Sequence, residues 1–230
     1  MSDPLADLAR ADGVPSAIAS ARDAVDAVLR DRGLSRIAAS RAAAARAAAA
    51  QASAELTADP PRWLPGALRV ARELPRLAGT LRVAPGQVLA RLHTLAAYGL
   101  VPGPDLGRPR TDPEVAARMA GLTGLLIAPG SAPAIVLGAV AHAEMIAVAP
   151  FGVADDLVAR ALERLVLIST GLDPAGVIVV EAGHAASPAN YQAALAGYRS
   201  GTPDGVRGWL IHCAEAVALG AGRWAEIRDG

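Results

Sequence analysis

Apolar residues recur every three or four positions along most of the chain, which is the spacing of amphipathic helices. Between Ser16 and Arg32 these positions share one face, and Gly33 marks the end of the segment. Proline or glycine separates most of the later segments of this kind. The ranges predicted to be helical are 16–32, 35–58, 66–77, 85–98, 111–127, 133–148, 154–170, 188–199 and 202–219. The sequence therefore predicts an all-α helical bundle.

Two local signals set boundaries between these helices. Residues 59–65 contain three prolines, which lack an amide donor, so they predict a break after the alanine-rich segment 35–58. Thr111 and Glu114 have the spacing of a capping box, with a proline in the first turn, and predict a helix start.

The order of the segments predicts one compact bundle with an extension. Residues 177–180, Val-Ile-Val-Val, are the only candidate strand, so we expect at most one short strand or hairpin. The segment 154–170 has the broadest apolar face, and we expect it at the centre of the fold. We divide the chain into an N-terminal helical extension, residues 1–110, packed on a core formed by residues 111–230.

The composition excludes several classes of ligand. The formal net charge is zero and no basic patch is interleaved with aromatic residues, so we expect no nucleic-acid partner. All basic residues apart from the histidines are arginine, and the excess of arginine and alanine is typical of a coding bias in the source genome. Cys213 is the only cysteine, which excludes an intrachain disulfide and a multi-cysteine zinc site.

The chain carries no signal for a membrane or for export. Its first residues include early acids and no apolar core of the signal-peptide kind. Residues 119–143 lack formal charge and are long enough to cross a bilayer, but Pro129, Gly130 and Pro133 interrupt them. We therefore expect a cytoplasmic protein with no membrane partner.

Residues 141–151, Ala-His-Ala-Glu-Met-Ile-Ala-Val-Ala-Pro-Phe, resemble the segment that enters the motif of the Fic family. That segment usually reads close to Ala-His-x-x-Phe-x-x-Ile-His-Pro-Phe. The ranges similar to other helices of the family are 131–136, 168–174, 191–198 and 209–214. Their order and spacing cover roughly residues 111–219, with a weaker extension back to Ala52. The resemblance implies the all-helical fold of nucleotide-transferring (AMPylating) enzymes.

The Fic motif reads His-Pro-Phe-x-(Asp/Glu)-Gly-Asn-Gly-Arg-x-x-Arg, and each part has a physical role. The histidine is the general base for the target hydroxyl. The acid holds a magnesium ion that bridges the nucleotide phosphates. The glycines let backbone amides approach these phosphates at a helix N-terminus, and the arginines neutralise phosphate charge.

Most of these groups are missing from this chain. The residues at the motif positions are Ala149, Pro150, Phe151, Val153, Ala154, Asp155, Asp156, Leu157 and Arg160. Ala149 cannot accept a proton as the base would, and Val153 cannot hold magnesium. The two adjacent aspartates stand where phosphate would bind, and each carboxylate about 4 Å from a phosphate adds roughly 1 kcal/mol of repulsion even in water. The sequence therefore predicts a degenerate site with no catalytic residue, no metal and no cofactor.

Many Fic proteins also carry an inhibitory helix, Ser/Thr-x-x-x-Glu-Gly/Asn, whose glutamate pairs with the last arginine of the motif. Residues 52–58 resemble this helix, with Ser53 in place. Thr57 stands where the glutamate should be, and Glu55 lies two positions off, on another face of a helix. The resemblance implies that the active site and its inhibitor decayed together.

Single polar residues have simpler interpretations. His142 and Glu144 form a His-x-Glu pair, but the cysteine pair of a zinc deaminase is absent, and we interpret His142 as a core histidine. His184 is predicted to be exposed and without a partner. Arg160 is either a relic phosphate ligand or, as we favour, the partner of Asp156 in an i, i+4 ion pair.

Two functions remain open at this point. We favour a non-catalytic Fic-like protein that binds or regulates an unidentified protein partner. The alternative is an enzyme of divergent chemistry that uses the same cleft, with Arg160, Asp155 or Asp156 as its polar groups and a phosphate-containing donor. The sequence leaves self-association open.

Overall fold

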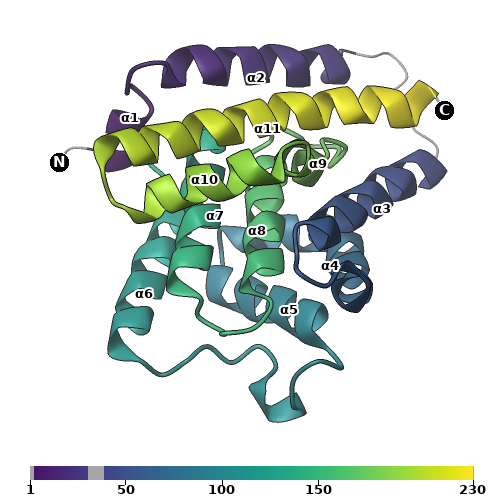
Figure 1. Cartoon of the computed structure of the whole chain (residues 1–230), viewed down its shortest axis with the longest axis vertical. Coiled ribbons are helices and arrows are strands. Elements are labelled where there is room, and N and C mark those ends of the chain that lie inside the picture. The colour runs from purple at the N-terminus through teal and green to yellow at the C-terminus, as the bar shows by residue number, and fades with distance from the viewer. Residues whose placement is uncertain (1–2, 31–38, 230) are drawn as a thin grey trace.

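The computed structural model describes residues 3–30 and 39–229, which form helices joined by short connections (Figure 1). The elements are α1 (Pro4–Leu8), α2 (Val14–Leu29), α3 (Ala39–Glu55), α4 (Pro60–Leu81), α5 (Pro85–Ala97), the 3-10 helix η2 (Gly103–Asp105), α6 (Pro113–Ile127), α7 (Ala134–Val148), α8 (Asp155–Ser169), α9 (Val180–Ala185), α10 (Pro188–Arg199) and α11 (Pro203–Asp229). The predicted all-α fold is confirmed for these residues. The predicted end of the first helix at Arg32 and the predicted start of the second helix at Ser35 lie outside the described residues.

α8 is the central helix of the bundle (Figure 1). Its residues from Leu157 to Leu167 are all buried, as is Asp155 at its start. Helices α3, α4, α5 and α7 pack against it. A helix covered on several sides buries apolar residues around most of its circumference, which is the broad apolar face seen in the sequence. The expected central position of this helix is confirmed.

α11 is the longest helix and lies between two layers (Figure 1). α2 runs along one side of it, while α9 and α10 pack on the other. Sequence reasoning ended this helix at Leu219, before Gly220, but it continues to Asp229. Gly220 is needed for close packing, because a Cβ atom there would lie 2.7 Å from the carbonyl oxygen of Val179.

The candidate strand 177–180 is not formed, which corrects that prediction. The backbone amides of Val177 and Ile178 donate to the carboxylate of Asp173, and the amide of Val179 donates to the carbonyl of Gly220. α9 begins immediately afterwards, at Val180. These apolar residues are buried, but their amides are satisfied by a side chain and by α11 rather than by a second strand.

Two predicted helix starts also differ from the structure. α4 begins at Pro60 rather than at residue 66, because Asp59 caps it and the first prolines need no amide partner. It also contains Pro65 and Pro75. α6 is capped by Asp112, which accepts from the amide of Glu114 at 2.8 Å, and not by Thr111 as the capping-box spacing suggested.

Helices from the predicted extension contribute to the same core as the later helices. α3, α4 and α5 pack on α8, and α2 packs on α11. The boundary near residue 110 stays a prediction. Among the described helices, none has the length and apolar composition required to cross a membrane.

Candidate functional site

The loop between α7 and α8 carries the altered motif positions. Ala149 and Ala154 have φ angles of 45° and 60°, in the left-handed region that residues other than glycine rarely adopt. Ala154 occupies the position of the first glycine of the motif, so the loop keeps a glycine-like turn although the glycine is gone. This conformation costs about 1–2 kcal/mol for an alanine.

Asp155 closes this loop with its own side chain. It is the first residue of α8, it is buried, and its Oδ1 accepts a hydrogen bond of 3.0 Å from the backbone amide of Phe151. Burial raises the pKa of this carboxyl to about 6, although hydrogen bonds from the backbone of Phe151 and Gly152 oppose the shift. The backbone amide of Phe151, just before α8, is therefore bound to the chain's own carboxylate, which lies at the first position of that helix.

Residues of the preceding connection fix the loop from the other side. The backbone amide of Arg110 donates to the carbonyl of Pro150 at 2.7 Å, and its guanidinium donates to the carbonyls of Val148 and Ala149. The ring of Phe151 stacks on His93, with centroids 4.1 Å apart. Sequence reasoning missed the contacts of Arg110 and His93 with this loop, since about forty and sixty residues separate them from it and no local pattern indicates the contacts.

Arg160, the last arginine of the motif, is buried and fully occupied by contacts within the chain. Its Nε donates to Ser53 Oγ at 2.9 Å, and one Nη donates to the carbonyl of Ser53 and to Asp156. The expected ion pair with Asp156 is present, at 3.0 Å. The guanidinium therefore faces α3 and its own helix instead of solvent.

The contact with Ser53 bears on the resemblance to an inhibitory helix. α3 does bring Ser53 against Arg160, whereas Thr57, at the glutamate position, donates its hydroxyl to the carbonyl of Ala54 at 2.6 Å. That α3 is a decayed inhibitory helix stays a prediction.

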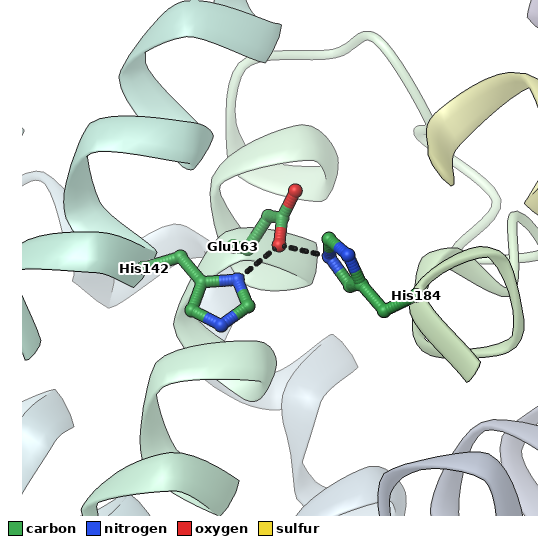
Figure 2. A group of neighbouring side chains, drawn as sticks. All are labelled: His142, Glu163 and His184. Carbon is green, nitrogen blue, oxygen red and sulfur yellow. Dashed lines mark hydrogen bonds and ion pairs between the residues drawn. The ribbon is translucent and has the colours of Figure 1, made fainter. Parts of the chain in front are cut away.

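A second polar group lies inside the bundle. Figure 2 shows His142 of α7 and His184 of α9 reaching one carboxylate oxygen of Glu163, on α8, from two sides. His142 Nδ1 lies 2.5 Å and His184 Nε2 lies 2.8 Å from Glu163 Oε2. All three side chains are fully buried, and these three ligand-type atoms lie within 4.8 Å of one another.

Further side chains extend this buried group. The other ring nitrogen of His142 lies 2.9 Å from the hydroxyl of Tyr191, and that of His184 lies 3.1 Å from Nε2 of His212. Trp209 packs edge-on against His142 and parallel to His184. Each imidazole is thus held at both nitrogens.

Burial controls the protonation of these groups. It lowers the pKa of His142 to about 4, although the hydrogen bond and the charge of Glu163 oppose this shift. Burial alone would raise the pKa of Glu163, but His184 and His142 beside it, which both hydrogen-bond to its carboxylate, hold the pKa well below its usual value. Burial also raises the pKa of Tyr191 to about 12.

Comparison with known proteins identifies the fold. No protein-family model and no curated protein sequence matches the chain. A solved structure does match: the crystal structure of a Fic family protein from Desulfovibrio desulfuricans G20 superposes with a TM-score of 0.70. The match covers 93% of this chain and 75% of that chain, with 14% sequence identity. The chain has a Fic-like fold. At this identity the likeness establishes the fold and not the activity.

Within the Fic-like fold, the residues at the altered motif positions lie together where α8 begins. His142 fits its interpretation as a buried, hydrogen-bonded core histidine. The prediction for His184 was wrong, because this residue is fully buried and contacts Glu163 and His212. The signal that could have placed it is Gly183, whose missing side chain lets α9 approach α11 closely.

The raised pKa of Asp155 predicts how stability changes with pH. Its folded-state pKa of about 6 exceeds its ordinary value of 3.8, so ionisation disfavours the folded state. This penalty is absent below about pH 4 and complete above about pH 6. Asp155→Asn keeps an oxygen acceptor for Phe151 and removes the charge. We expect it to raise the free energy of unfolding by about 1–3 kcal/mol at pH 8 and by almost nothing at pH 4.

Urea unfolding of both proteins at the two pH values measures this difference. The matched control is Asp105→Asn, which makes the same change at an exposed aspartate of η2 and should show no such pH dependence. If Asp155→Asn increased the free energy of unfolding equally at both pH values, the pKa of Asp155 would not be raised in the folded state.

Proposed function

We propose that this chain is a Fic-like protein that has lost nucleotide transfer and acts by binding another protein. The observation that carries the proposal is the hydrogen bond from the Phe151 amide to the buried carboxylate of Asp155. An anion site at a helix N-terminus needs room for the anion beside the backbone amides. Here the bond holds the buried carboxylate of Asp155 at the first position of α8, and this carboxylate would repel a phosphate.

The groups that perform the chemistry elsewhere in the Fic motif are also missing. Ala149 offers only a methyl group at the base position, and its carbonyl is bound by Arg110. Val153 has no oxygen with which to hold magnesium. The proposal follows from base, metal ligand and phosphate site being lost together.

The alternative, a divergent enzyme in the same cleft, would need polar groups that reach a substrate. Of the three candidates, Arg160 is 1% exposed and Asp155 is 7% exposed. Asp156 is the candidate most exposed to solvent, with 39% of its side chain accessible, and it is paired with Arg160. A single paired carboxylate is a poor basis for catalysis, which favours the binding function.

Rebuilding the motif tests the loss of transfer. Ala149→His alone should leave self-labelling undetectable with a nucleotide that is radioactive at its α-phosphate, because Asp155 still holds the amides of the loop. Base, metal site and phosphate cradle act as a unit, and the effects of such groups are strongly non-additive. Adding Val153→Glu and replacing residues 154–157 by Gly-Asn-Gly-Arg supplies the missing groups and should give labelling.

The control for the rebuilt variant is the same variant with Ala149 left in place, which keeps the new cradle but lacks the base. Labelling by Ala149→His alone would mean that the natural loop still holds a phosphate donor. That result would overturn the proposed loss and favour the divergent enzyme.

The binding part of the proposal concerns the native protein. Isolated from its source cells after cross-linking, the chain should carry a second polypeptide at a fixed molar ratio, measured by quantitative mass spectrometry. Recovery of the chain alone, together with turnover of a phosphate-containing donor by that preparation, would contradict the proposal.

A further inference from the structure

The buried group of His142, Glu163 and His184 joins three consecutive helices, α7, α8 and α9. It supplies two imidazole nitrogens and one carboxylate oxygen, a set of ligands typical of zinc and related divalent metals. The set is separate from the degenerate Fic motif, whose metal position is Val153. Neither local spacing nor the motif predicts it.

The distances are close to those that an ion requires. Zinc lies about 2.0–2.2 Å from nitrogen and oxygen ligands, so ligands at 90–109° to one another are about 2.9–3.4 Å apart. The two imidazole nitrogens lie 2.5 and 2.8 Å from Glu163 Oε2. Each imidazole would then turn a lone pair toward the ion and carry its proton on the other ring nitrogen, which faces Tyr191 or His212. The carboxylate oxygen would separate from each nitrogen by less than about 1 Å.

The surroundings hold the imidazoles as the outer partners of a metal site do. The ring nitrogens that face away from Glu163 meet Tyr191 and His212, at 2.9 and 3.1 Å. Metal-binding histidines usually have such a partner on the second nitrogen, which fixes the orientation of the ring. Trp209 packs against both rings and limits their rotation.

The balance of buried charge also favours binding of a cation. Among the described residues, the buried side chains with formal charge, histidine aside, are Arg160, Arg164, Asp155, Glu163, Asp173 and Glu181. The buried groups with formal charge are thus two guanidinium groups and four carboxyl groups. Unbalanced charge in a protein interior is costly, and one divalent cation would bring the formal sum to zero. Glu163 is the carboxylate among the four that is bound by imidazoles.

We propose that His142, Glu163 and His184 bind one divalent transition-metal ion of the zinc class. The ion links α7, α8 and α9 at the centre of the bundle and has a structural role. Because the ligands are fully buried, the ion enters as the chain folds and is not exchanged at the surface. The inference is independent of the proposed loss of nucleotide transfer.

Refolding of the full chain tests this site. A version without a polyhistidine tag is unfolded in denaturant with a chelator, then refolded with or without Zn²⁺ and desalted. We expect about one zinc per chain by elemental mass spectrometry, and a higher Tm for the zinc-refolded protein. X-ray absorption at the zinc edge should show nitrogen and oxygen neighbours at about 2.0–2.2 Å, with the scattering pattern of imidazole.

Variants locate the ion within the chain. His184→Gln and Glu163→Gln should lower the zinc content at least tenfold, whereas His93→Gln, which removes a buried imidazole elsewhere, should leave it near one per chain. If the first two variants do not fold, the absorption spectrum of the unaltered protein decides. Zinc below about 0.1 per chain after refolding, a spectrum without imidazole, or a His184→Gln variant that keeps its zinc would overturn the proposal. The group would then be a metal-free set of hydrogen bonds.

Discussion

The charges on α8 are the constraint around which the rest of the fold is arranged. This helix is surrounded by others, yet it carries both acids and arginines, and an unpaired charge in the core costs several kcal/mol. Glu163 is met by two histidines from α7 and α9. Arg164 donates to the carbonyl of Gly176 and lies 3.5 Å from Glu181. The positions of these neighbouring elements follow from the partners that α8 requires.

The same constraint applies to the polar residues in the first two turns of α8. Arg160 is used to attach α3 through Ser53, and Asp155 is used to close the loop before the helix. At both positions the polar side chain is satisfied by hydrogen bonds within the protein.

Most helices could be predicted because their apolar spacing and their caps are local. The Asp156–Arg160 ion pair was predictable for the same reason. The candidate strand 177–180 does not form, because the carboxylate of the nearby Asp173 takes two of its amides. The exposure of His184 was wrong, because Glu163, on another helix, takes the imidazole. The contact of Arg110 with the loop is also non-local, and no spacing in the sequence indicates it.

The most direct measurement is the position of the Phe151 and Gly152 backbone amide signals in two-dimensional ¹H–¹⁵N NMR spectra. Because Asp155 accepts from the amide of Phe151 and lies beside Gly152, both signals should shift as the pH passes through about 6, the pKa of that carboxyl. They should stay in place when ATP and Mg²⁺ are added to millimolar concentration at constant pH and ionic strength. A shift of both signals that saturates with ATP would show that the loop binds phosphate, and it would contradict the account.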